Sequence, residues 1–240
     1  MSGLFFLGAF VAEIIGTIAG FGSSTVFLPI ALVFFDFKTA LTLVAFFHLF
    51  GNLTRIVYFH KGMDMKVFVL FAIPSVIAAF IGAYLVNYLP YEILKGLLGI
   101  FLIIYSLWAL TNHYLKIKNK TRSTIIGGVV SGFIAGLIGT GGAVRGAMLN
   151  ALVKNKNKYI ATAASVAFVV DLTRIPIYIA QGYLRENMMW YLLVLFVIAL
   201  IGSYLGKIIV DRIPQKGFRV IVLLAVLAAG TYFVYQWIFV

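Results

Sequence analysis

Long apolar runs separated by short polar breaks make up almost the whole chain. The mean hydropathy is +1.07 and 11% of the residues are charged, whereas a soluble domain carries roughly a quarter charged residues. Lipid tolerates little backbone other than helix, because every N–H and C=O group must find a partner inside the protein. One crossing takes about 20 apolar residues, so 240 residues leave almost nothing for an aqueous domain. The sequence therefore predicts an all-α polytopic membrane protein and excludes a catalytic domain outside the membrane.

Two sets of five apolar runs follow one another with the same order of long and short segments. Leu-Thr-Arg-Ile occurs at 53–56 and again at 172–175, and Ile-Gly-x-Tyr-Leu occurs at 81–85 and again at 201–205. Several matches in order at almost constant offset indicate an internal duplication. We predict two membrane repeats, 1–115 and 124–240, joined by a basic cytoplasmic linker, 116–123. The runs lie at 3–19, 25–35, 39–59, 67–86 and 93–115, then at 125–138, 143–153, 160–180, 188–210 and 218–239.

Loop charge distinguishes two ways of threading each repeat, because cytoplasmic loops of membrane proteins are rich in Lys and Arg. If 3–35 and 125–153 each make one broken crossing, seven basic residues lie on one face and nine on the other. If both segments instead fold back as hairpins, the division is three against thirteen, with three more arginines inside apolar runs. The three are Lys38, Lys95 and Arg185, and the thirteen are Lys61, Lys66, Lys116, Lys118, Lys120, Arg122, Lys154, Lys156, Lys158, Lys207, Arg212, Lys216 and Arg219.

Hairpin threading gives each repeat a glycine-turned hairpin followed by three transmembrane helices, which is an odd number of crossings. The two repeats are then inverted relative to each other, as in many secondary transporters. We expect a multi-pass protein of the cell (plasma or inner) membrane, with both termini outside and the basic loops in the cytoplasm. The formal net charge of +12 then matches the anionic cytoplasmic leaflet of the bilayer rather than nucleic acid. The absence of cysteine excludes disulfides and thiolate metal sites.

Glycine-rich turns lie in the middle of both hairpins. Unwound backbone survives in lipid only when it is buried in protein or faces a wet cavity. Each turn precedes a short helix, predicted to start near Thr25 or Ala143, whose free N–H groups and positive dipole end point toward the turn. Two such ends suit a small anion held by amides and hydroxyls, and close packing of small residues is the alternative. The predicted substrate-binding residues are Gly22, Ser23, Ser24, Thr25, Gly139, Thr140, Gly141 and Gly142.

The residues around the two turns also carry a resemblance. They are Gly-Thr-Ile-Ala-Gly-Phe-Gly-Ser-Ser-Thr-Val-Phe-Leu-Pro at 16–29 and Gly-Phe-Ile-Ala-Gly-Leu-Ile-Gly-Thr-Gly-Gly at 132–142, within the duplicated architecture. The chain resembles the sulfite exporter TauE/SafE family of membrane permeases over essentially its whole length. The resemblance implies an exporter or permease for sulfur-containing oxyanions or organosulfonates. The sequence departs from the family pattern at Ser23 and Ser24, where many relatives have glycines, and at Arg145 and Gly146, where the first repeat has an apolar residue and a proline.

Three arginines inside apolar runs are further candidate substrate-binding residues, because a membrane-embedded charge needs a partner or a purpose. Arg145 follows the second turn by three residues, and its forked donors suit an oxyanion; a structural pair with a carbonyl or carboxylate is the alternative. Arg55 and Arg174 occupy equivalent places in the repeats, where substrate or gating contact competes with snorkelling to the headgroups. Asp171 precedes Arg174 by three residues and predicts a local ion pair. Asn52 takes the corresponding place before Arg55.

Three other ionisable residues are candidates for proton coupling: Glu13, His48 and Asp171. Glu13 lies midway along the first hairpin arm with no basic residue at helical spacing, so it is either a proton carrier or a neutral acid hydrogen-bonded across helices. His48 lies in an otherwise apolar stretch, where it either joins a proton relay or is a packed, hydrogen-bonded histidine.

Together these features predict a membrane transporter that moves a small anion by alternating access, with a sulfur oxyanion or organosulfonate as the expected substrate and with possible proton coupling. The expected partners are that anionic substrate and the lipid bilayer, without nucleic acid and without any cofactor, and a homodimer is left open. An anion channel is the nearest alternative, because the same turns can line a pore. An intramembrane enzyme would need converging acids, histidines or a nucleophile, which the sequence does not show. A scaffold would need loop surface for its partners, and the loops of this chain are short.

Overall fold

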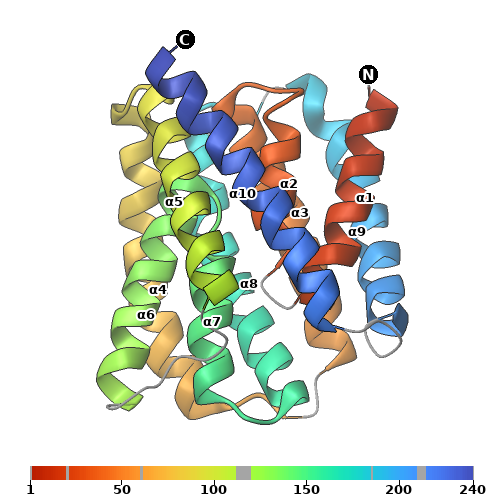
Figure 1. Ribbon diagram of the computed structural model, residues 1–240, viewed down its shortest axis with the longest axis vertical. Coiled ribbons are helices and arrows are strands. Elements are labelled where there is room, and N and C mark those ends of the chain that lie inside the picture. The colour runs from red at the N-terminus through yellow and green to blue at the C-terminus, as the bar shows by residue number, and fades with distance from the viewer. Residues whose placement is uncertain are drawn as a thin grey trace.

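The computed structural model describes residues 2–19, 22–59, 62–111, 120–184, 186–209 and 215–239, and this part of the chain is helical and contains no strand (Figure 1). The first five helices are α1 (Ser2–Ala19), α2 (Ser24–Ala31), α3 (Phe37–Tyr58), α4 (Met65–Leu85) and α5 (Tyr91–Thr111). The next five are α6 (Lys120–Ile138), α7 (Gly142–Leu152), α8 (Lys156–Ala180), α9 (Met189–Ile209) and α10 (Gln215–Phe239). A short 3₁₀ turn, η1 (Val86–Tyr88), follows α4, and a second one, η2 (Glu186–Met188), precedes α9.

The helices form a multi-pass membrane protein, as the apolar runs predict. Within the described ranges, 7 helices are long and apolar enough to cross a membrane, and α1 contributes a shorter apolar helix. Large apolar side chains point outward over much of the bundle, including Ile73, Leu193 and Ile221, which is the arrangement that a lipid environment favours. Residues 112–119 lie outside the described ranges, and the last four residues of the predicted linker form the first turn of α6.

Polar side chains fix the starts of three helices at the ends of the bundle. The Asp36 carboxylate accepts a hydrogen bond from the Thr39 N–H at the start of α3, and Asp64 accepts one from Val67 at the start of α4. The Asn155 side chain does the same for Lys158 at the start of α8. These caps satisfy N–H groups that have no partner within the helix. Short loops can therefore connect helices that run in opposite directions.

Contacts at the two ends of the bundle are those that hairpin threading requires. At one end, the Lys38 amine lies 4.9 Å from the centroid of the Tyr183 ring, which joins the start of α3 to the segment after α8. At the other end, the Asp64 N–H donates to Thr162 in the first turns of α8. A single broken crossing in each repeat would place the members of both pairs at opposite ends. The chain therefore reverses between α1 and α2 and again between α6 and α7, and it begins and ends at the same end of the bundle (Figure 1).

The longer helices pack in pairs that join the two halves of the chain. Helix α1 packs along α9 and α6 along α4, while α3 packs against α8 and α5 against α10. The α4–α6 contact is a backbone-to-backbone contact: a Cβ atom at Gly132 would lie 2.1 Å from the Ser75 carbonyl oxygen. Small residues permit this close approach, which is a common way for helices to associate in membranes. The apolar core includes Phe5, Phe27 and Phe47, and it surrounds the short helix α2.

Candidate functional site

The two glycine-rich turns meet inside the bundle. The hydroxyls of Thr25 and Thr140 are 2.8 Å apart and buried, although the two residues are 115 positions apart in the chain. Gly22 and Gly139 both have positive φ, at 88° and 78°, a conformation that glycine adopts without steric cost. The short helices α2 and α7 begin immediately after the turns, each within one residue of the predicted start. Gly20 and Phe21 lie outside the described residues.

The first turn contains buried hydroxyl groups that have no hydrogen-bond partner within the described chain. Ser23 and Ser24 are buried, and the hydroxyl oxygen of each is without a partner. Thr25 uses its hydroxyl to contact Thr140, and Ser131 donates to the Gly141 carbonyl in the second turn. Buried polar groups are normally hydrogen-bonded, and an exception calls for an explanation such as a missing ligand. The first turn therefore has spare hydrogen-bonding capacity.

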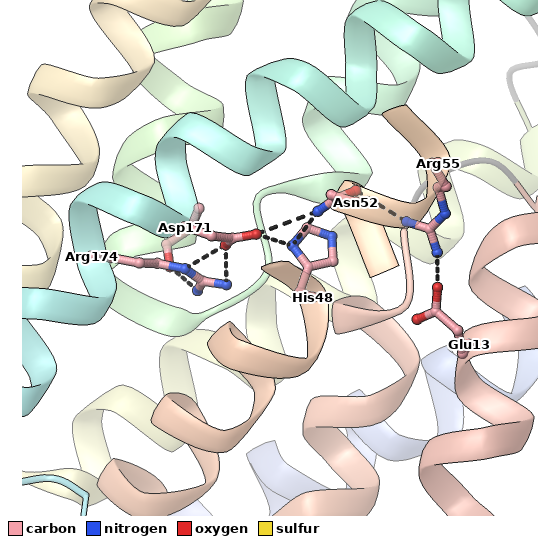
Figure 2. A network of polar contacts seen from close by, with 7 residues as sticks. Glu13, His48, Asn52, Arg55, Asp171 and Arg174 are labelled. Atoms are coloured by element: carbon pink, nitrogen blue, oxygen red, sulfur yellow. Dashed lines mark hydrogen bonds and ion pairs between the residues drawn. The ribbon is translucent and has the colours of Figure 1, made fainter. Parts of the chain in front are cut away.

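Arg55, near the end of α3, is the centre of one buried polar network (Figure 2). Its Nη2 atom donates to Glu13 Oε1 at 2.5 Å and to the Thr17 hydroxyl at 3.0 Å, both on α1. Its Nη1 atom donates to Asn52 Oδ1 at 3.1 Å. Glu13 Oε1 also accepts from Ser203 of α9 at 2.6 Å. Arg55 is therefore ion-paired inside the bundle, and the snorkelling alternative is wrong for it.

Asp171 of α8 is the centre of a second network, which Asn52 joins to the first (Figure 2). The Asp171 carboxylate accepts from Arg174 Nε at 2.9 Å and Nη2 at 2.8 Å, so the expected local ion pair is present. It also lies 2.8 Å from His48 Nδ1 and accepts from Asn52 Nδ2 at 3.3 Å. Arg174 Nη1 donates to the Ala135 carbonyl at 2.7 Å. Arg174 is 1% exposed, so snorkelling is wrong for this arginine as well.

Arg145, in the first turn of α7, differs from the other two buried arginines. It is 4% exposed, and among the described residues it makes no salt bridge. Among the described residues, the buried side chains include three guanidinium groups, Arg55, Arg145 and Arg174, but two carboxylates, Glu13 and Asp171. A buried charge without a counter-charge is costly. Within the part of the interior that the structure describes, positive charges therefore exceed negative charges by one, and Arg145 carries the excess.

A cavity of about 50 Å³ lies beside this charge. One wall is polar and includes Thr17, Asn52, Arg55 and Arg145. The remaining lining residues are Gly16, Gly22, Phe59, Gly142, Gly146, Tyr159, Ile160, Ala163, Ala164 and Lys207. A cavity needs at least about 10–15 Å³ to contain one water molecule, so this one has room for a few waters or a small ion. Lys207, near the end of α9, also lines the cavity, so the cavity reaches the end of the bundle that carries this basic residue.

The structure distributes the predicted site residues over three places. Gly22, Gly142, Arg55 and Arg145 line the cavity. Ser23, Ser24, Thr25, Gly139, Thr140 and Gly141 belong to the meeting turns but do not line the cavity. Glu13, His48, Asp171 and Arg174 form the buried networks next to it.

Sequence reasoning did not identify Thr17, Tyr159, Lys207 or Ser203 as site residues. Thr17 follows Glu13 by four residues and so faces the same side of α1, a signal that could have been used. Lys207 was counted as a loop charge, but its amine lies 4.9 Å from the centroid of the Tyr58 ring and it lines the cavity. Nothing local in the sequence marks Ser203, because its partner Glu13 is 190 positions away.

Comparison with known proteins agrees with this architecture. The chain is 29% identical over 242 residues to the protein described as "Probable membrane transporter protein MJ0441" of Methanocaldococcus jannaschii, and the match covers 90% of this chain and 89% of that protein. The family described as sulfite exporter TauE/SafE matches residues 4–233. With its hairpins, buried turns and nearly complete match, the chain belongs to the sulfite exporter TauE/SafE family of membrane transporters.

Proposed function

We propose that this protein transports a small anion across the membrane and that Arg145 binds it. The observation that carries the proposal is the unbalanced buried charge of the described residues: three arginines, two carboxylates, and a cavity beside Arg145, which has no ion-pair partner among those residues. A bound monoanion makes the interior neutral. It thereby removes the cost of a desolvated guanidinium without a counter-ion.

The cavity also offers the geometry that an oxyanion requires. The Arg145 guanidinium presents forked donors, which match the oxygen atoms of a planar or tetrahedral oxyanion. Helices α2 and α7 both begin at the turns beside the cavity, where their first N–H groups have no partner within the helix. The unpartnered hydroxyls of Ser23 and Ser24 do not line the cavity, but they follow Gly22, which does, and they would add donors if the turn moved. Sulfite, which the family description names, is a sulfur oxyanion that fits these donors, and we extend the proposal to small organosulfonates.

Alternating access between two inverted repeats is the transport mechanism that we propose. The helix pairs support it. The first helix of each repeat, α1 or α6, packs on the fourth helix of the other, α9 or α4, and the third helices α3 and α8 pack on each other. Each helix pair thus has a matching pair in which the two repeats have exchanged places, and this is a pattern that a two-fold axis in the membrane plane produces. Rocking one repeat against the other would then open the meeting turns to each side in succession.

We place the protein in the cell membrane with both termini outside, and the direction of transport that we propose is export from the cytoplasm. The distribution of basic loops is consistent with this placement. The cavity extends toward the end of the bundle that carries Lys158 and Lys207, and such basic ends face the cytoplasm. Proton coupling is part of the proposal, with Glu13, His48 and Asp171 as candidates. All three are buried next to the cavity in networks that contain arginine, so loss or gain of one proton changes the charge that the anion meets. We propose that the protein acts as a carrier and not as an enzyme.

Anion flux into proteoliposomes tests this function. Sulfite, thiosulfate and sulfoacetate are the probes, with protein-free liposomes as the background. We expect Arg145→Ala to lower saturable flux at least about tenfold, since losing a charged hydrogen bond costs roughly 1.5–3 kcal/mol. Arg145→Lys, which keeps the charge but not the fork, should retain part of the activity. Lys154→Ala, at an exposed position of the same end, is the matched control and should transport normally.

Wild-type flux in Arg145→Ala would remove Arg145 from the mechanism. Flux that rises linearly with concentration and does not saturate would identify a channel instead of a carrier. The absence of flux for every probe would contradict the proposal for this substrate class.

A further inference from the structure

The His48 imidazole lies behind the first turn with one nitrogen unused. His48 is on α3 and is 2% exposed. Its Nδ1 atom is 2.8 Å from Asp171 Oδ2. Its Nε2 atom is buried and has no hydrogen-bond partner within the described chain. Buried polar atoms are normally hydrogen-bonded. Because the described residues supply no partner for this nitrogen, it is available for a hydrogen bond to a ligand.

The partners of Nδ1 determine what Nε2 can do. An ionised carboxylate only accepts hydrogen bonds, so the contact with Asp171 places the ring hydrogen on Nδ1. The Asn52 amide nitrogen also lies 3.1 Å from Nδ1. The orientation of that amide is fixed by the bond from Arg55 to its oxygen, so its N–H donates to Asp171 instead. In the neutral ring, Nε2 is therefore a bare acceptor.

Gly22 separates this acceptor from the cavity. A Cβ atom at Gly22 would lie 2.8 Å from His48 Nε2 and 3.9 Å from Arg145 Nη2. The two nitrogens therefore both lie within 4 Å of one point beside Gly22. Gly22 also lines the cavity and has a positive φ. An ion held by Arg145 would meet Nε2 if Gly22 moved aside.

We propose that His48 Nε2 is the second recognition group of the anion site and that the preferred ligand is an oxyanion carrying one hydrogen. This inference rests on the proposed anion transport and specifies its substrate class. Arg145 donates to the ionised oxygens of the ligand, while the ligand O–H donates to Nε2. A fully ionised oxyanion that is basic near neutral pH, such as sulfite, reaches the same bound state by taking up one proton from solution, which it then shares with Nε2. Either way, one anion and one proton are bound together, and no covalent bond is made or broken.

The charges around the imidazole are consistent with a single shared proton. Asp171 and Arg174 of α8 form one ion pair beside the ring, Asn52 on α3 is neutral, and Arg145 approaches from α7. The surplus positive charge of Arg145 attracts the anion, and the acceptor at Nε2 selects the form with a hydrogen. An oxyanion that neither carries a hydrogen nor is basic enough to take one up, such as sulfate, would leave Nε2 unpaired in the complex, and such mismatches are strongly rejected by buried sites.

The affinities for sulfate, phosphate and sulfite distinguish a site that needs only an anion from one that also needs a hydrogen on the ligand. Sulfate carries no hydrogen near neutral pH, whereas phosphate and sulfite both exist partly in hydrogen-bearing forms. Isothermal titration calorimetry of the full-length protein in detergent measures each affinity. Repeating the sulfite titration at pH 8 in buffers of different ionisation enthalpy counts the protons taken up. For the wild-type protein we expect phosphate and sulfite to bind at least about tenfold more tightly than sulfate, with close to one proton taken up per sulfite.

His48→Asn is the variant that isolates Nε2. The asparagine amide can still donate to Asp171 in the place of Nδ1, but it has nothing at the position of Nε2. We expect this variant to lose most of the preference over sulfate and to take up no proton, while its affinity for sulfate changes less than about threefold. Its melting temperature in detergent reports whether it folds, and the wild-type measurements test the proposal even when it does not.

The outcomes separate this inference from the proposed function. Wild-type protein that binds sulfate as tightly as sulfite, without proton uptake, would overturn the role of Nε2 but leave anion binding intact. The same follows from a folded His48→Asn protein that keeps the wild-type preference. If none of the three anions binds to the wild-type protein, both proposals fail together.

Discussion

Arg55 and Arg174 occupy equivalent places in the two repeats but have different surroundings. Arg174 pairs with Asp171 on its own helix and donates to the Ala135 carbonyl at the end of α6, just before the second turn. Arg55 has Asn52 in the corresponding position and finds its carboxylate, Glu13, on α1. Arg55 also lines the cavity, whereas Arg174 does not.

The difference shows how a duplicated motif can serve two purposes. Arg174, together with the hydrogen bond from Tyr178 to the Gly136 carbonyl, ties α8 to the segment before the second turn. Phe59, the equivalent of Tyr178, has no hydroxyl and lines the cavity instead. Arg174 and Tyr178 therefore hold α8 against α6 as a fixed wall, whereas Arg55 and Phe59 line the cavity together with Arg145 of α7.

The largest expected effect is the loss of stability caused by replacing Arg174. Arg174→Ala leaves Asp171 buried without its main counter-charge, which costs about 3–5 kcal/mol in comparable buried pairs. We expect a large drop in melting temperature in detergent and loss of the folded protein from membranes. Arg55→Ala should be less destabilising, because the adjoining cavity can admit water beside Glu13, but it should abolish transport. Equal destabilisation by the two substitutions would contradict the division of roles.

Asn52→Asp tests the charge difference between the repeats. The substitution makes the first repeat resemble the second and adds the negative charge that the interior lacks. We expect anion affinity to fall about tenfold or more, because the cavity then offers no net positive charge, while the protein remains folded. Titration of sulfite into the purified protein measures this loss, with the shape-matched Asn52→Leu as the control for disturbed packing. Unchanged affinity in Asn52→Asp would show that net charge does not control binding.

Tyr178→Phe removes only the hydroxyl that the second repeat has and the first repeat lacks. The Gly136 carbonyl then loses a donor, and we expect a loss of about 1 kcal/mol of stability with transport nearly intact. Thermal unfolding in detergent and proteoliposome flux measure the two effects. A loss of transport without a loss of stability would assign Tyr178 to the mechanism and not to the wall.

Much of the fold could be predicted from the sequence, because the signals are local. Apolar runs predicted the helices, and the distribution of Lys and Arg predicted hairpins with which the contacts of Lys38 and Asp64 agree. Glycine-rich turns predicted the starts of α2 and α7 to within one residue. Arg145 could be identified as an intramembrane charge because it follows the second turn by three residues.

Partners that come from different helices could not be predicted. Glu13 has no basic residue at helical spacing, yet it pairs with Arg55, 42 positions away. His48 pairs with Asp171 over 123 positions. The snorkelling alternative for Arg55 and Arg174 was wrong for the same reason, since only the packed bundle shows that carboxylates surround them.

The sequence alone determined that the chain is a bundle of membrane helices interrupted by two glycine turns, because lipid restricts the backbone residue by residue and charge restricts each loop. Tertiary structure decided that the turns meet at Thr25 and Thr140, which buried charges neutralise one another, and that Arg145 is left without a carboxylate. Those features depend on which side chains come within about 3 Å of each other after helices far apart in the chain pack together. The electrostatics of the interior is therefore a property of the packed bundle and not of any one helix.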